Sequence, residues 1–173
     1  MSKVIKFGLS VSEIQRAIRE LDKFKQDFRN KVDTFRKRIA DEIAAQASLN
    51  FGSAVVDDVI NGSPRRPDVT VSVSERGSIA VVVADGEDAV WCEFGAGVYH
   101  NGSVGSSPNP YGDDLGFTIG SYGDGHGKQQ AWGYYDENEA LVITRGTPAS
   151  MPMYNAAQDV LRKSVQIARE VFK

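Results

Sequence analysis

The sequence predicts an α+β fold in which an antiparallel sheet of about four strands carries a long N-terminal helix and a C-terminal helix on one face. Three observations lead to this prediction. The first fifty residues have the periodicity of one amphipathic helix, the middle contains two hairpin patterns, and a second helical pattern follows them. At 173 residues, the chain is expected to form a single domain with its own core.

The long helix is predicted over about residues 12–50, because its apolar residues recur at steps of three or four and form one stripe. Ser10 and Glu13 have the spacing of a capping box at its start. The stripe consists of Ile14, Ile18, Leu21, Phe24, Phe28, Val32, Phe35, Ile39, Ile43 and Ala47. A straight helix of about 36 residues is roughly 54 Å long, more than a compact chain of this size would cover. It therefore either bends near Arg29 and Asn30 or projects at one end, and we expect it to pack on its own sheet and also to reach a neighbouring subunit.

Two hairpins are predicted from the strand patterns. In the first, over about residues 69–84, three valines alternate with hydroxylic residues, and a more buried strand returns after a turn at 75–78. The second covers about residues 131–145, with a turn at 136–139. The short apolar element at 89–94 fits either a strand or a helical turn.

The C-terminal helix is predicted over about residues 151–171. Gly146 and Pro148 end an extended run, Ser150 is a good N-cap, and Pro152 lies near the first turn, where its missing N–H is not needed. An apolar face on this helix gives it a surface to bury.

A glycine-rich loop is predicted over about residues 95–130. Eleven of the 17 glycines lie between 95 and 133, which makes this backbone costly to order. Four aromatic side chains in the loop offer apolar surface to a partner, and they are our candidate partner-interaction residues: Tyr99, Tyr111, Phe117 and Tyr122. We expect the loop to become ordered on binding, although a tolerated insertion is the alternative.

Composition narrows the function classes. No apolar run approaches the ~20 residues of a membrane span, no signal-peptide pattern is present, and one cysteine rules out an internal disulfide framework. The net charge of −3 is uneven, because residues 1–50 carry net charge +4 and residues 51–148 carry −9. Such opposite regions favour self-association or a differently charged neighbour over sequence-specific nucleic-acid binding, and the alternative is that the charges are simply solvated surface. A free coiled-coil dimer is disfavoured, because Lys25 interrupts the best heptad register.

Few residues are candidates for chemistry. Cys92 and His126 could act as a nucleophile and a base, as in a cell-wall hydrolase, but a cysteine between Trp91 and Phe94 is more often a small core residue. Adding His100 gives three soft zinc ligands without a metal-binding spacing. The Gly120–Gly127 run lacks the Lys-Ser/Thr of a phosphate loop, and the adjacent acids Asp113 and Asp114 are more often solvated than metal-bound. We therefore predict no catalytic residue, cofactor or metal.

Four segments occur in an order that resembles one protein family. They are the lysine-rich first helix, the segment Val90-Trp91-Cys92-Glu93-Phe94-Gly95-Ala96-Gly97, the glycine-rich middle, and the run from Thr144 to Ala157, which contains Arg-Gly-Thr-Pro-Ala and Met-Tyr-Asn-Ala. This pattern resembles the minor tail component or tail-completion (neck) proteins of long-tailed bacteriophages and Gram-positive prophages. Arg145 stands where many relatives have His, and Ala96 where Thr is common.

The resemblance implies a structural virion protein at the head–tail junction, not an enzyme. It implies a homo-oligomeric ring that contacts other phage neck and tail proteins, with possible passage of DNA through the ring. The implied location is the virion, with assembly in the host cytoplasm. A cell-wall hydrolase using Cys92 and His126, or another virion interaction module, remains the alternative.

Overall fold

The computed structural model of the chain describes residues 4–97, 108–112, 114–115 and 131–173. The elements follow in the order α1 (Val11–Ser53), β1 (Thr70–Arg76), β2 (Ile79–Asp85), α2 (Ala89–Phe94), β3 (Ala96–Gly97), β4 (Trp132–Tyr135), β5 (Leu141–Thr144), β6 (Gly146–Thr147) and α3 (Pro152–Val171). The prediction of an α+β chain with a long N-terminal helix and a C-terminal helix is confirmed. The ambiguous apolar element at 89–94 is a short helix.

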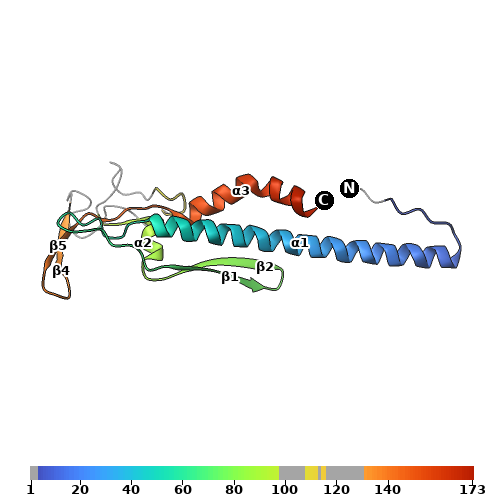
Figure 1. Cartoon of the computed structure of the whole chain (residues 1–173), viewed down its shortest axis with the longest axis horizontal. Helices are drawn as coiled ribbons and strands as arrows, with labels where there is room; N and C mark the ends of the chain where they lie inside the picture. The colour runs from blue at the N-terminus through green and yellow to red at the C-terminus, as the bar shows by residue number, and fades with distance from the viewer. Residues whose placement is uncertain (1–3, 98–107, 113, 116–130) are drawn as a thin grey trace.

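The described elements are layered around α1. Figure 1 shows α3 along one side of α1 and the β1–β2 hairpin along the other. Helix α1 contacts α3 and both strands of the hairpin. The prediction that both helices share one face of a sheet is therefore wrong. The amphipathic pattern identified a buried stripe on α1, but it did not show that a second side of this helix is also covered.

The prediction of one sheet of about four strands is also wrong. Three two-stranded antiparallel sheets form instead, from β1 with β2, β3 with β6, and β4 with β5. A segment after α1 accounts for part of the difference, because it pairs along β5. The Ile60 amide donates to the Ile143 carbonyl at 2.7 Å, and the Asn61 side chain bonds the backbone of Leu141 and Ile143. That edge of β5 is consequently not open to the first hairpin.

The first helix is continuous and longer than predicted. Ser10 caps its start by accepting from the Glu13 amide, and the helix runs unbroken through Arg29 and Asn30 to Ser53. Its 43 residues correspond to about 65 Å at 1.5 Å per residue. Phe172, the C-cap of α3, packs against Phe28 and Phe35 of α1, with ring centroids 5.8 and 6.2 Å away. Helix α3 therefore reaches only as far as these two residues. The start of α1 thus extends beyond α3 (Figure 1).

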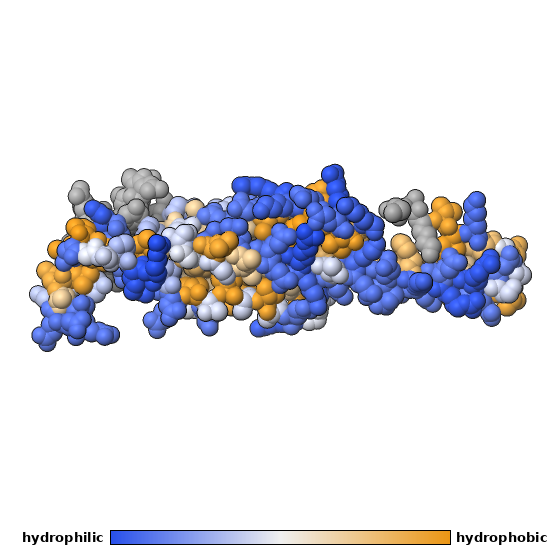
Figure 2. All heavy atoms as spheres, in the orientation of Figure 1, coloured by the Kyte–Doolittle hydropathy of each residue, from blue (hydrophilic) through white to orange (hydrophobic). Residues whose placement is uncertain are grey.

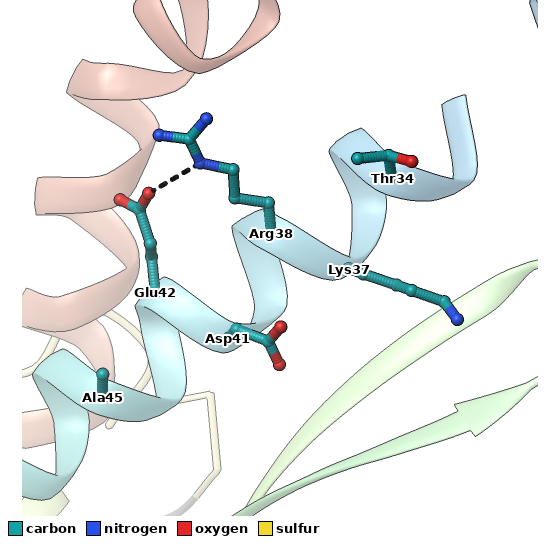
Figure 3. A pocket seen from close by; sticks show the side chains of 6 residues that line it. All are labelled: Thr34, Lys37, Arg38, Asp41, Glu42 and Ala45. Carbon is teal, nitrogen blue, oxygen red and sulfur yellow. Dashed lines mark hydrogen bonds and ion pairs between the residues drawn. The ribbon is translucent and has the colours of Figure 1, made fainter. Parts of the chain in front are cut away.

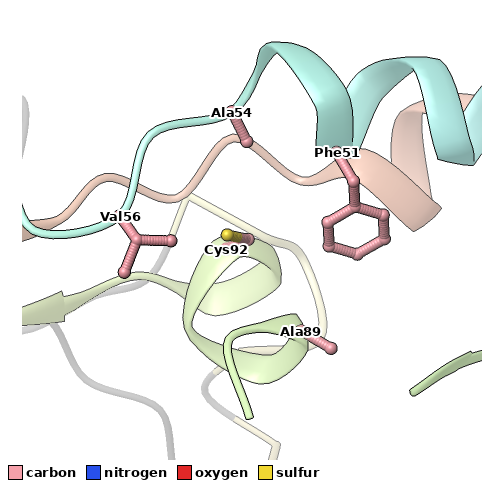
Figure 4. Close-up of a cluster of buried hydrophobic side chains, with 5 residues drawn as sticks. All are labelled: Phe51, Ala54, Val56, Ala89 and Cys92. Atoms are coloured by element: carbon pink, nitrogen blue, oxygen red, sulfur yellow. The ribbon is translucent and has the colours of Figure 1, made fainter. Parts of the chain in front are cut away.

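A buried hydrophobic cluster lies at the other end of α1. The cluster joins Phe51 at the end of α1, the residues that follow it, and α2 (Figure 4). Its members are Phe51, Ala54, Val56, Ala89 and Cys92. The contact between α1 and α3 is lined by small or branched residues that let two helices approach closely, namely Ala40, Ala47, Ala156, Val160 and Ile167.

Candidate functional site

Two segments of the sequence pattern, 90–97 and 144–157, meet in space. Ala96 and Gly97 pair with Thr147 and Gly146 as strands β3 and β6. Just beyond this pair, the amides of Ser150 and Met151 both donate to the Cys92 carbonyl, at 2.9 and 3.1 Å. The α2 segment and the approach to α3 are thereby fixed together, and we call this region (residues 88–97 and 144–155) the junction.

Glu93 is the central polar side chain of the junction. Helix α3 begins with Met151 at its N-cap, which makes no side-chain cap, and with Pro152, which has no N–H. The next two amides, of Met153 and Tyr154, donate to the Glu93 carboxylate at 2.8 and 3.0 Å. A carboxylate from another element therefore provides the cap that the local sequence lacks, and its negative charge suits a helix N-terminus.

The Glu93 side chain is also buried. The Asn109 side-chain amide donates to the same carboxylate at 2.9 Å, so that three donors surround it. Burial raises the pKa of Glu93 above its usual value, whereas the hydrogen bonds from Met153, Tyr154 and Asn109 act in the opposite direction. Sequence reasoning did not assign Glu93 a role. The available signal was an acidic residue inside an apolar run, where a carboxylate needs partners.

Cys92 is fully buried within the junction, as a member of the hydrophobic cluster. Burial raises the pKa of its thiol to about 11, with a further contribution from the Asp88 carboxylate. A nucleophilic cysteine needs an accessible thiol that ionises readily, and Cys92 has neither property. His126 and His100 lie outside the described residues, so the predicted Cys92–His126 pair and the three-ligand zinc group have no described geometry.

An ion pair between Arg65 and Asp88 fixes the segment that precedes β1 to the start of α2. The Arg65 guanidinium donates to both oxygens of Asp88, at 2.7 and 2.8 Å, and the Asp68 amide donates to the same carboxylate at 3.0 Å. These bonds, first of all those from Arg65, hold the pKa of Asp88 below its usual value. The bidentate geometry fixes the loop before β1 against α2. Its role is structural, and the separation of 23 residues hides it from the sequence.

The described residues contain no arrangement typical of catalysis. No group of three or more His, Cys, Asp or Glu residues in this part of the chain could hold a metal ion. Figure 3 shows a hollow on α1, between α3 and the hairpin, whose charged lining includes Arg38 and Glu42 paired with each other. Arg38 also contacts Glu170 of α3 at 2.7 Å. The hollow lies over a charged strip of α1 between α3 and the β1–β2 hairpin.

Tyr111 is the one predicted partner-interaction residue that falls within the described part of the chain. Its ring lies edge-on to that of Tyr154, at a centroid separation of 6.2 Å, and 59% of the residue is exposed. Its amide donates to the Asn109 side chain, which binds Glu93. The other three candidates, Tyr99, Phe117 and Tyr122, lie outside the described residues, and so does most of the predicted 95–130 loop.

Two further surfaces stand out because apolar side chains are exposed there. One is the stripe along the start of α1, where six large side chains are between 38% and 55% exposed: Ile14, Ile18, Leu21, Phe24, Phe28 and Val32. The other is the β4–β5 hairpin, with Tyr135 and Leu141. Figure 2 shows apolar surface at both ends of the elongated molecule. No helix among the described residues has the length and apolarity needed to cross a bilayer.

Comparison of the chain with models of known protein families, with curated proteins and with solved structures gives no match.

Proposed function

We propose that the chain is a structural virion protein of the phage neck or tail, which acts as an oligomeric ring in tail completion or head–tail connection. The observation that carries the proposal is the apolar stripe at the start of α1. A monomer with six large side chains half exposed along one helix face has surface that a partner is expected to cover. The four-segment resemblance supplies the kind of assembly.

The junction supports this reading of the two sequence segments. The Glu-Phe-Gly segment and the Gly-Thr-Pro-Ala segment serve each other, because Glu93 caps α3 and the Cys92 carbonyl accepts from Ser150 and Met151. Their residue types therefore have a scaffolding explanation that needs no substrate. In the proposed ring, the junction fixes the end of α1 and the start of α3, while other surfaces make the contacts between subunits.

The competing proposal, a cell-wall hydrolase that uses Cys92, is disfavoured by the junction. A thiol with no exposed surface and a pKa of about 11 cannot reach or attack a peptide carbonyl without local unfolding. We therefore expect purified protein to cleave neither peptidoglycan nor peptides.

The experiment is removal of the chain from a phage or prophage that encodes it. We expect electron microscopy to show filled heads and complete-looking tails that are not joined, and we expect wild-type protein supplied in trans to join them. Supplying Cys92→Ala is the matched control, and it should join them at permissive temperature because the thiol has only a packing role. Normally joined virions in the absence of the chain would contradict the proposal.

A further inference from the structure

We propose that the exposed stripe at the start of α1 docks on the β4–β5 hairpin of a second copy of the chain, in a head-to-tail contact. The inference rests on the proposed function in one respect, because it names the surfaces through which the proposed ring is built. The exposure, the charge and the positions of the two surfaces support the contact itself.

The stripe continues a face of α1 that is already an interface. Between Phe28 and Ala47 this face packs against α3, and Phe28 is the point at which α3 ends. Toward the helix start, the same apolar spacing continues beyond α3. Residues 4–10 run back past this end of α1 (Figure 1) and Ala17 is buried there, but Ile18 and Leu21 remain more than half exposed. A second apolar surface placed in line with α3 would extend the existing interface along α1.

The charge on the stripe restricts its occupant. Lys25 follows Leu21 by four residues and precedes Phe28 by three, so it lies on the stripe itself, with Arg29 one turn further along. Residues 14–32 contain six basic and three acidic side chains. An ammonium enclosed by an apolar contact needs a carboxylate beside it. Pairing two copies of the stripe would bring like net charges together, which disfavours a symmetric helix pair.

The β4–β5 hairpin has the complementary chemistry. Tyr135 and Leu141 are paired in its register, so their side chains share one face, and they are 73% and 48% exposed. Residues 132–144 contain three acidic side chains and no basic one. Asp136 is used within the turn, where its side chain accepts from the amides of Asn138 and Ala140. Glu137 and Glu139 are exposed at the tip and form no salt bridge with the described residues.

The two surfaces lie at opposite ends of the molecule, with the start of α1 at one end and β4–β5 at the other (Figures 1 and 2). They cannot meet within one copy in this arrangement. A contact between unlike ends of two copies is heterologous, and repeated contacts of this kind close into a ring when the rotation between neighbours allows it. The proposed contact is therefore of the kind that a ring requires.

The test is a charge exchange in the full-length chain, followed by sedimentation over a wide concentration range. Lys25→Glu with Arg29→Glu reverses the stripe, and Glu137→Lys with Glu139→Lys reverses the hairpin. We expect each double variant to raise the dissociation constant of self-association by at least about tenfold. An equimolar mixture of the two should associate again, because every reversed stripe then finds a reversed hairpin and every original stripe an original hairpin.

The matched control is Arg19→Glu with Lys23→Glu, which changes the net charge equally but lies on the opposite side of α1. We expect it to associate like the wild type, and circular dichroism should show native helix content in all variants. Equal weakening by the stripe and control variants, a mixture that stays dissociated, or a wild type that is monomeric throughout would each overturn the inference. A ring that persists in both reversed variants would reject these surfaces and leave the proposed function standing. Joined virions without the chain would reject the function and leave the contact standing.

Discussion

The junction and the start of α1 contrast sharply, although one helix connects them. At the junction, Cys92 is buried in a cluster with Phe51 from the end of α1, and Glu93 has three hydrogen-bond donors. At the start of α1, Phe24 and Leu21 are about half exposed on a helix that extends past α3 and the β1–β2 hairpin. An isolated helix of this kind is only marginally stable. The comparison indicates that the junction determines the stability of the monomer, whereas the start of α1 is a surface for assembly.

Truncating one phenylalanine at each end of α1 should show the largest difference between the two regions. Phe51→Ala removes a ring that is 3% exposed and should lower the free energy of unfolding by about 4 kcal/mol. Phe24→Ala removes a ring that is 43% exposed and should cost less than about 1 kcal/mol in the monomer. Urea unfolding at a concentration below self-association measures both. Similar losses at the two positions would contradict the contrast.

Glu93→Ala is expected to have the next largest effect. It leaves the amides of Met153 and Tyr154 without their acceptor, and a loss of about 3 kcal/mol is expected from buried donors without partners. Glu93→Gln is the matched control, because one amide oxygen still accepts, and it should lose less. Denaturant unfolding followed by far-ultraviolet circular dichroism reports both the stability and the helix content. An alanine variant as stable as the wild type would show that the cap from Glu93 does not stabilise α3.

Asp88→Asn should cost about 2 kcal/mol at neutral pH, the scale of a charged hydrogen bond. The cost depends on pH with a definite sign. Because the pKa of Asp88 is lowered in the folded state, its contribution is full above the ordinary value of 3.8 and is lost as pH falls through the lower folded value. The wild type and the variant should therefore converge in stability below about pH 3.8. A constant difference down to pH 2 would show that the ion pair with Arg65 is not responsible.

Among the substitutions at buried positions, Cys92→Ala should have the smallest effect, about 1 kcal/mol, since the change leaves only a small cavity. The native thiol should also resist a thiol reagent at pH 8, because it is buried and its pKa is about 11. Absorbance of the released reagent group gives the rate, and urea-unfolded protein provides the fully reactive reference. Fast labelling of the native chain would support the alternative in which Cys92 acts as a nucleophile.

Local patterns in the sequence predicted the elements better than their assembly. The three- and four-residue steps from Ile14 to Ala47 predicted α1, and the alternating valines predicted the first hairpin, because each pattern reflects burial on one face of the element itself. The arrangement of the hairpins was missed. Residues 58–61 occupy an edge of β5, and their lack of strand alternation gave no sign of this role.

The candidate site was predictable to a similar extent. The sequence singled out the segments around Cys92 and after Thr144, but it could not show that Glu93 caps a helix that begins 59 residues later in the chain. Such a contact depends on tertiary structure and leaves no periodic signal. The length of the α1 pattern predicted that the helix either bends or projects at one end, since a straight helix of that size exceeds a compact chain. The helix is continuous, and its start extends beyond α3. For the aromatic loop residues, Tyr111 alone has a described position.

Hydrogen exchange of backbone amides at several protein concentrations can distinguish a stable junction from an assembly surface at the start of α1. In dilute solution, we expect amides from Val11 to Val32 to exchange much faster than those of Met153 and Tyr154 at the junction. As concentration rises and copies associate, protection should increase at the start of α1 and at β4–β5, while the junction stays unchanged. Strong protection of the start of α1 in the dilute monomer, with no dependence on concentration, would contradict the claim that this helix end is an assembly surface.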